Sequence, residues 1–252
     1  MDIKNDIYIM KMNDKLYQRL IQSEHIIHAK VESVLGQISS WKYATHELYV
    51  PAPYQNELAG LPSGRIRKNV EEKDRLKIAG LYSFGFDAEG KILCSQEAPE
   101  NIENGIITDI YEYDDAFSYH VFHVRYIPNQ YTIIISISYF YSYHEMSIFQ
   151  GINAYKDWSV YLYEYDKGRI SKVHRYASCW GDREAEEYNF VYDNNILCAI
   201  VGEKRLKNGE LDIHWKNKKV LVAGSGKSGI GAADLLKKVG ADIVIYDGNE
   251  KI

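Results

Sequence analysis

Cysteine is scarce in this chain of 252 residues, which contains three and has no Cys-x-x-Cys pair. Cys94, Cys179 and Cys198 lie too far apart in the sequence to indicate a disulfide framework or a zinc site. Long apolar runs are also absent: the longest, Tyr131–Tyr143, is shorter than the roughly 20 residues of a membrane-spanning helix. The first residues lack the apolar core of a signal peptide. These absences predict a soluble, cytoplasmic protein with no membrane partner.

Positive charge is not in excess either, because 30 lysine and arginine residues face 35 aspartate and glutamate residues, for a net charge of −5. The short basic run at 65–68 is followed by Glu71 and Glu72, and we therefore predict no nucleic-acid partner. Tyrosine, by contrast, is abundant, with 22 residues against 7 phenylalanines. Tyrosine suits half-buried strand faces and binding surfaces, so this composition favours a protein that has one or both.

Apolar residues near the N-terminus recur at steps of three and four from Leu16 to Ile38. Asn13 and Asp14 precede them and can cap a helix. We therefore predict one helix that runs to about Ile38, with its apolar stripe on a sheet. Residues 39–75 contain three prolines and a charge-rich run, and we predict mainly loop there, with room for a short helix.

Residues 76–215 consist of short β-branched and aromatic runs separated by turn residues. The turn sequences are of the kind that favours β-hairpins, at Asp87–Gly90, Asp166–Gly168, Asp193–Asn195 and Asn208–Gly209. Each hairpin carries its two strands and its turn locally. The sequence therefore predicts an antiparallel meander rather than parallel strands with crossover helices.

The composition changes near His214–Lys219, where the aromatic content falls and a parallel strand–helix–strand pattern begins. We therefore predict an α+β protein with two domains. In residues 1–214 a long N-terminal helix packs on a Tyr-rich, hairpin-rich antiparallel sheet. Residues 218–252 form a truncated, Rossmann-like βαβ segment.

The second predicted domain carries a glycine-rich turn of the form G-x-G-x-x-G, made of Gly224, Ser225, Gly226, Lys227, Ser228 and Gly229. It follows the apolar strand 220–223, and a predicted helix and strand lead on to Asp247. Gly224 permits a tight turn, Gly226 lets the backbone approach a pyrophosphate, and Gly229 lets the helix pack on the strand. The start of the helix offers N–H groups to phosphates. The pattern predicts a nucleotide site, but not a Walker A loop, because position 221 is leucine.

The run KKVLVAGSGKSGIGAADLLKKVGADIVIYDGNEK, within residues 218–252, resembles the N-terminal start of the UDP-N-acetylmuramoyl-L-alanine:D-glutamate ligases of the Mur ligase family. In that family this region opens the domain that binds the UDP part of the substrate. The resemblance implies that Ser225–Ser228 approach the diphosphate and that Asp247 lies near the uridine. The ATP-binding and C-terminal domains of the family have no counterpart here, so complete ligase activity is not implied. Residues 1–214 carry no such resemblance.

Histidines offer weaker signals. His25 and His28 can share one face of the predicted helix, but no third or fourth ligand follows, and we assign no metal site. His120 and His123 lie three residues apart on a predicted strand, so their side chains should point to opposite faces. Cys179 lies five residues after His174 and could act as a hydrolase nucleophile only if the fold brought a base to it. We assign no catalytic residue.

Acidic residues lie beside tyrosine-dense strands, in the groups Glu112–Asp115 and Asp182–Glu187. They are either solvated loops or part of an acidic, Tyr-rich recognition face for a basic protein. The second interpretation predicts a non-enzymatic binding protein, of the kind exemplified by small bacterial immunity proteins, that has a protein partner and no cofactor. One alternative is UDP-sugar binding through Gly224–Gly229; if the segment binds no nucleotide, it is a structural appendage. Another alternative is a hydrolase that uses Cys179 and His174.

Overall fold

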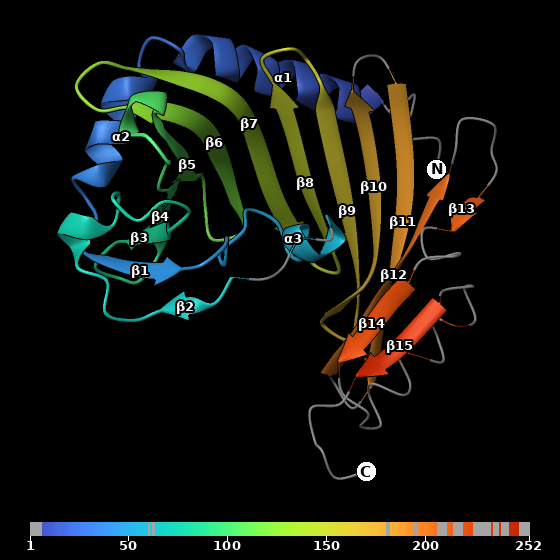
Figure 1. The fold of residues 1–252 in the computed structure, drawn as a ribbon. Coiled ribbons are helices and arrows are strands. Elements are labelled where there is room, and N and C mark those ends of the chain that lie inside the picture. The colour runs from blue at the N-terminus through green and yellow to red at the C-terminus, as the bar shows by residue number, and fades with distance from the viewer. Residues whose placement is uncertain are drawn as a thin grey trace. The chain divides into compact units, whose positions relative to one another are not determined.

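The computed structural model describes residues 7–59, 61, 64–179, 182–193, 196–205, 211–213, 219–223 and 242–246, together with Ala233 and Lys237. The chain divides into two compact units, Met1–Val160 and Tyr161–Ile252. Figure 1 shows the elements of both units. None of the helices that the structure describes has the length and apolar character needed to cross a membrane.

The first unit is built on an antiparallel sheet. Its strands are β1 (Ser40–Ala44), β2 (Ile66–Arg67), β3 (Tyr82–Phe86), β4 (Ile92–Glu97), β5 (Ile106–Tyr113), β6 (Ser118–Ile127), β7 (Tyr131–Tyr143) and β8 (Met146–Asn153). They are hydrogen-bonded in the order β8-β7-β6-β5-β4-β3-β1-β2. The described helical segments are α1 (Ile7–Ser23), α2 (Ile27–Leu35), α3 (Gln55–Leu58) and short 3-10 turns at Glu72–Asp74 and Ile102–Asn104. From β3 to β8 each strand lies beside its neighbour in the sequence, as in a meander.

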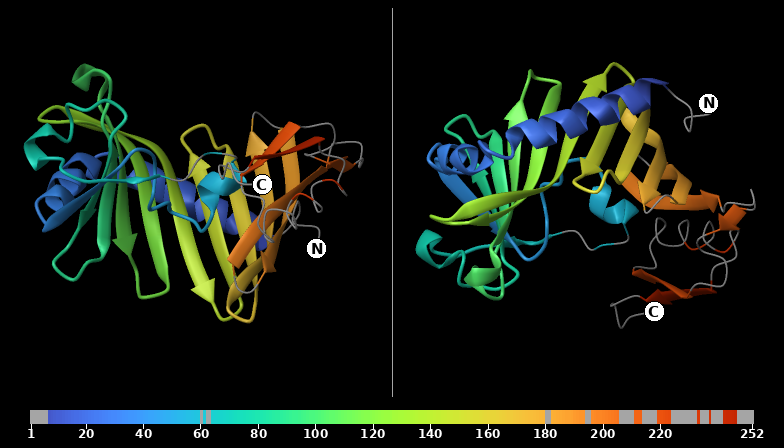
Figure 2. Two further views of the ribbon diagram at one scale, coloured as in Figure 1. Left: turned by 60° about the horizontal axis from the view of Figure 1, so that its bottom comes forward. Right: turned by 90° about the horizontal axis from the view of Figure 1, so that it is seen from above.

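Helices α1 and α2 pack on one face of this sheet, and α1 crosses β7 and β8 (Figures 1 and 2). The core between them is apolar and almost fully buried; it consists of Leu16, Leu20, Ile27, Val31, Ile106, Ile110, Phe122, Val124, Tyr126, Ile134, Ile137 and Ile152. On β5 and β6 these residues alternate with side chains on the other face, because successive strand residues point to opposite sides. We call this the helix face of the sheet and its reverse the outer face.

The prediction of one long N-terminal helix is wrong. The helix begins before the predicted cap, at Ile7, so that Asn13 lies inside α1, where it is buried and its Oδ1 accepts a hydrogen bond of 2.6 Å from Gln150 Nε2. One turn after Leu20 the apolar stripe is interrupted by Ser23 and Glu24, and α1 ends at Ser23. A turn follows, and α2 then returns its own apolar residues to the core. The region predicted to be loop contains β1 and α3.

The hairpin prediction is confirmed where the structure describes the turns. Between β3 and β4, Asp87 Oδ1 accepts backbone N–H bonds from Glu89 and Lys91, and Gly90 has a φ of +82°. A φ of this sign suits glycine, which has no Cβ to clash with the backbone. Asn194, Asn195, Asn208 and Gly209 lie outside the described residues.

The larger sheet of the second unit is also antiparallel. It contains the end of β9 (Trp158–Asp166), then β10 (Arg169–Cys179), β11 (Asp182–Asp193), β12 (Ile196–Arg205) and β13 (Leu211–Ile213), hydrogen-bonded in that order. Tyr188 on β11 is paired with Gly202 on β12. A Cβ placed on Gly202 would lie 2.8 Å from the Tyr188 ring, so the missing side chain makes room for that ring.

The predicted α+β class is also wrong. The described residues are mainly antiparallel strands, and their helical segments are few and lie chiefly in residues 7–35. No Rossmann-like βαβ unit is present among them. Strands β14 (Lys219–Ala223) and β15 (Asp242–Tyr246) do pair in parallel, but most of the segment that joins them lies outside the described residues. The hairpin chemistry repeated along the chain therefore sets the fold class, while α1 and α2 cover one face of the first unit. The domain boundary at 214–218 remains a prediction.

Phe122 is fully buried in the core between the helices α1 and α2 and the sheet. We expect Phe122→Ala to lower the free energy of unfolding by about 3–5 kcal/mol, because the substitution removes apolar contacts and leaves a cavity. Ile133→Ala on β7 is the matched control, since Ile133 is 49% exposed and should cost less than about 1 kcal/mol. Urea denaturation monitored by circular dichroism measures both. Equal losses for the two variants would show that the core is misplaced.

Candidate functional site

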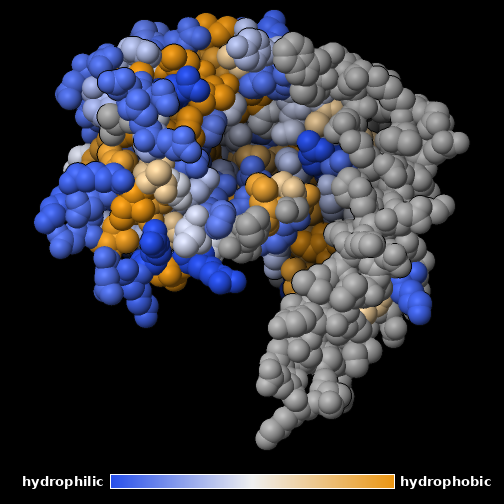
Figure 3. Space-filling model, viewed as in Figure 1, coloured by the Kyte–Doolittle hydropathy of each residue, from blue (hydrophilic) through white to orange (hydrophobic). Residues whose placement is uncertain are grey.

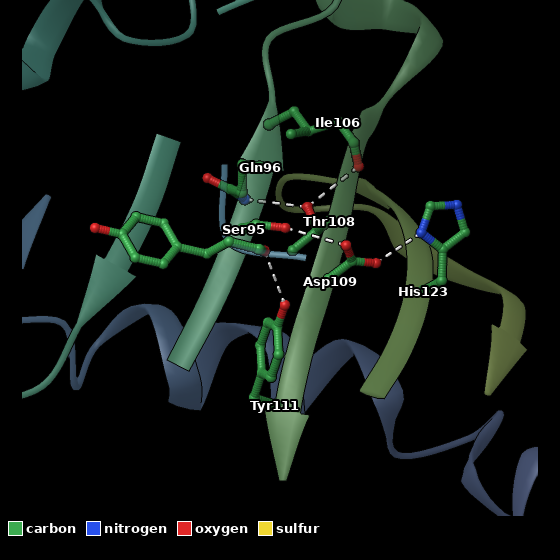
Figure 4. Close-up of polar contacts among 8 residues, drawn as sticks. Ser95, Gln96, Ile106, Thr108, Asp109, Tyr111 and His123 are labelled. Carbon is green, nitrogen blue, oxygen red and sulfur yellow. Dashed lines mark hydrogen bonds and ion pairs between the residues drawn. The ribbon is translucent and has the colours of Figure 1, made fainter. Parts of the chain in front are cut away.

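A row of polar side chains crosses three strands on the outer face of the first unit. Ser95 on β4 is the register partner of Asp109 on β5, and Asp109 is the partner of His123 on β6. Paired residues project from the same face of a sheet, so the three side chains meet. Ser95 Oγ donates to Asp109 Oδ2 at 3.1 Å, and His123 Nδ1 lies 2.7 Å from Asp109 Oδ1 (Figure 4).

Asp109 is the centre of this row and is only 9% exposed. Burial lowers the pKa of His123, but the hydrogen bond and charge of Asp109, together with the charges of Glu47 and Glu97, outweigh burial and raise that pKa above its ordinary value. His123 and Asp109 therefore form a half-buried ion pair on the sheet when His123 is protonated.

A second carboxylate, that of Glu47, interacts with this pair from the segment between β1 and α3. Burial and the charge of Asp109 raise the pKa of Glu47 from its ordinary value of 4.5 to about 7, although the charge of His123 opposes them. Glu47 therefore gains and loses its proton near neutral pH.

The segment that carries Glu47 is held against the outer face by tyrosine hydroxyls. Tyr111 Oη donates to the carbonyl of Tyr49 at 3.3 Å, and Tyr119 Oη donates to the carbonyl of Pro51 at 2.6 Å. The Tyr49 ring also packs edge-on against Phe84, with ring centroids 5.0 Å apart. Part of the abundant tyrosine thus has a structural role, attaching a covering segment to the sheet.

The order of groups in the polar row does not suit nucleophilic catalysis. A serine nucleophile needs a base on its hydroxyl and a third group that orients the base. Here the carboxylate of Asp109 lies between Ser95 and His123, so the imidazole does not reach the hydroxyl. Ser95 is also only 4% exposed, which closes it to a substrate. Among the described residues no group of three His, Cys, Asp or Glu side chains could hold a metal ion.

The other predicted pairs do not form sites. His28 Nδ1 lies 2.9 Å from Thr132 Oγ1, whereas His25 lies in the turn between α1 and α2. His174 lies on β10 between the carboxylates of Glu164 (3.1 Å) and Glu187 (3.4 Å). Cys179 is five residues further along the same strand, about 16 Å away at the usual rise per residue, so the hydrolase pair is not assembled.

His120 and His123 point to opposite faces of β6, as predicted. His120 packs against Tyr139, with ring centroids 4.6 Å apart, while His123 contacts Asp109. Several of the acidic residues form ion pairs with cations of the chain, which the sequence did not predict. Glu112 pairs with Arg19 and Lys30, and in the second unit the carboxylates of Glu186 and Glu187 pair with Arg175 and Lys172 respectively.

The predicted nucleotide-binding residues Gly224, Ser225, Gly226, Lys227, Ser228, Gly229 and Asp247 lie outside the described residues. The strands that precede them are described. Ala223 at the end of β14 is the register partner of Tyr246 at the end of β15. The motif and Asp247 therefore follow directly in sequence from two paired strand ends, and their role stays a prediction.

Because Glu47 takes up its proton more readily in the folded chain, the free energy of unfolding should fall as pH rises from about 4.5 through 7. We expect a fall of roughly 1–2 kcal/mol, allowing for solvent screening of a half-buried group. Glu47→Gln should flatten this slope and be more stable than the wild type at pH 8. Glu89→Gln, on an exposed turn, is the control. Urea titrations from pH 4.5 to 8 measure the slopes; an unchanged slope in Glu47→Gln would refute the assignment.

Comparison with known proteins confirms the resemblance of the C-terminal segment. A UDP-N-acetylmuramoylalanine–D-glutamate ligase of Lachnospira eligens is 70% identical over 37 residues, which are 15% of this chain and 8% of the ligase. The ligase of that name from Lachnoclostridium phytofermentans is 52% identical over 40 residues, which are 16% of this chain and 9% of the ligase. The one from Ligilactobacillus salivarius is 57% identical over 35 residues, or 14% and 8%.

The chain thus spans less than a tenth of the length of these relatives. No protein-family model matches the chain. No solved structure matches it either. One short segment is therefore similar to part of a Mur ligase, and the match covers only about 15% of the chain.

Proposed function

We propose that the chain is a non-enzymatic binding protein, and that its first unit recognises a basic segment of a partner protein. The observation that carries this proposal is a group of exposed apolar side chains at the tips of neighbouring hairpins, with acidic residues in the same turns. We call it the tip surface; its members are Asp114, Asp115, Phe117, Tyr141, Glu145 and Met146.

Three of these side chains can act as anchors. Phe117 is 66% exposed, Met146 48% and Tyr141 37%. Aromatic residues and methionine are enriched at protein interfaces, where buried anchors supply much of the binding energy. Backbone contacts hold the three together: the N–H of Ser142 donates to the carbonyl of Phe117 at 2.9 Å, and Met146 is the register partner of Tyr143.

The charge of the tip surface suits a basic partner. A backbone N–H from Phe117 lowers the pKa of Asp115, which keeps that carboxylate ionised. Asp114 and Glu145 add two more acidic groups from adjoining turns. Such a cluster attracts a positively charged segment and aligns it before the apolar contacts form. In the space-filling view, apolar and polar patches lie side by side on the coloured part of the surface (Figure 3).

A binding role is also favoured by the chemistry of the polar residues. The Ser95–Asp109–His123 order does not activate a nucleophile, and His174 lies far along its strand from Cys179. The acidic groups at Glu112 and Glu186 are neutralised by nearby cations, which restricts the proposed recognition face to the hairpin tips.

To test this proposal, the immobilised chain is exposed to lysate of its native host at low salt, and retained proteins are identified by mass spectrometry. We expect a basic protein to be retained, and the double variant Phe117→Ser/Asp115→Asn to retain at least tenfold less. Ile66→Ser is the control, because Ile66 is 63% exposed on β2, outside the tip surface. Retention should also fall as salt is raised. The proposal fails if nothing is retained, or if the tip variant retains the same basic protein.

A second candidate function is binding of a UDP-sugar through residues 224–229, and the 70% identity to a D-glutamate ligase over 37 residues favours it. That relative is named as a ligase of UDP-N-acetylmuramoylalanine and D-glutamate. The parallel pairing of β14 with β15 supports the proposal, because a glycine-rich turn that follows such a strand can offer backbone N–H groups to a diphosphate.

Isothermal titration with UDP-N-acetylmuramoyl-L-alanine tests this second function. We expect measurable heat from the wild type and at least a tenfold weaker affinity for Gly226→Val, because a side chain there would block the approach of the backbone to the diphosphate. Lys219→Gln, at the start of β14, serves as the control. Absence of heat with the wild-type chain would eliminate this candidate.

A further inference from the structure

A cavity of about 820 Å³ lies between the helices and the helix face of the sheet in the first unit. Its polar lining includes Arg19 from α1, Lys30 from α2, Glu112 from β5, Asp114 from the following turn, and His120 from β6, with Tyr139 from β7 beside them. This volume is in the range of small-molecule sites in proteins. The cavity is distinct from the polar row at Asp109, which lies on the outer face.

Two of the cations that line this cavity contact one carboxylate. Glu112 Oε1 lies 2.9 Å from Arg19 Nη2, and Glu112 Oε2 accepts a hydrogen bond from Lys30 Nζ. Burial raises the pKa of Glu112, but the two cations outweigh burial and lower it. The lining as a whole is balanced in charge, because the cations Lys15, Arg19 and Lys30 are matched in number by the carboxylates of Asp14, Glu112 and Asp114. A guanidinium has five N–H donors and an ammonium has three, so Glu112 leaves several donors of Arg19 and Lys30 for another acceptor.

His120 supplies a second, independent observation. The residue is 8% exposed, and its Nδ1 has no hydrogen-bond partner among the described residues, although Asp114 Oδ2 is 3.2 Å away in a poor geometry for such a bond. A buried polar atom that makes no hydrogen bond is costly, which favours a ligand that satisfies it.

The protonation of His120 follows from the same surroundings. Burial and the charges of Arg19 and Lys30 lower the pKa of His120 to about 4, although the charges of Asp114 and Glu112 oppose them. The imidazole is therefore neutral at neutral pH, and the charge of a bound anion would raise its pKa.

We propose that this cavity binds a small organic anion, a carboxylate or a phosphate joined to an apolar or aromatic body. Its oxygens take the remaining N–H donors of Arg19 and Lys30, and its body lies against the ring of Tyr139. The negative charge favours protonation of His120, whose Nδ1 then donates to the anion or to Asp114. Binding is accordingly accompanied by uptake of a proton, and affinity falls as pH rises. A cationic ligand has no acceptor to offer to these N–H donors.

Isothermal titration of the full chain at pH 6 with benzoate and with phenyl phosphate tests this assignment. Benzylamine and benzyl alcohol are matched cationic and neutral probes, and inorganic phosphate tests the need for the apolar body. We expect at least one aromatic anion to bind with a Kd below about 1 mM, and the two matched probes and inorganic phosphate to bind at least tenfold more weakly. The heat should differ between buffers of different ionisation enthalpy, which reports the proton taken up.

Three variants locate the site. Arg19→Gln should weaken anion binding at least tenfold, and His120→Gln should remove the dependence of the heat on the buffer. His123→Gln, on the outer face of the same strand, should change neither. The His120 ring proton resonances of the wild-type chain provide a measurement that does not depend on a variant folding, and they should shift on anion addition. Three results would each overturn the proposal. They are tighter binding of benzylamine than of the anions, no heat and no resonance shift with either anion, and unchanged anion binding in both Arg19→Gln and His120→Gln.

Discussion

The pairing of β5 with β6, from Ile106↔Tyr126 to Tyr113↔Tyr119, determines where the other groups of the first unit can lie. In this register one set of residues, such as Ile110 and Phe122, points to the helices, and the alternate set, such as Asp109 and His123, points to the outer face. A slip of one residue would exchange the two sets, placing carboxylate and imidazole in the apolar core. The same register therefore determines which side chains form the apolar core and which form the polar row.

The charged groups on the helix face and those on the outer face of the sheet have different surroundings. On the helix face, Glu112 is compensated by two cations, and the neutral His120 is left without a hydrogen bond among the described residues. On the outer face, burial and the charge of Asp109 raise the pKa of Glu47, and the hydrogen bond and charge of Asp109 raise the pKa of His123, so both groups hold their protons more strongly than usual.

The sequence allowed prediction of those features that depend on residues close together in the chain. The turn at Asp87–Gly90 was predictable because its aspartate and glycine act within a few residues. The polar row was not, because Ser95, Asp109 and His123 are brought together by strand register, and a bulge between His123 and Val124 changes the pairing with β7. The break after Ser23 was missed because the apolar spacing resumes beyond it. The motif at 224–229 was recognised by its pattern of residues, and its resemblance to a ligase is confirmed although its function is not tested.

The attachment of the covering segment has a consequence for how this protein can change in evolution. Tyr111 and Tyr119 donate to main-chain carbonyls, those of Tyr49 and Pro51, and not to side chains. The sheet therefore holds the path of the segment without depending on which amino acid stands at a position such as Val50. Substitutions there can accumulate while the backbone stays in place, and the surface of this region can diversify between relatives without loss of the fold beneath it.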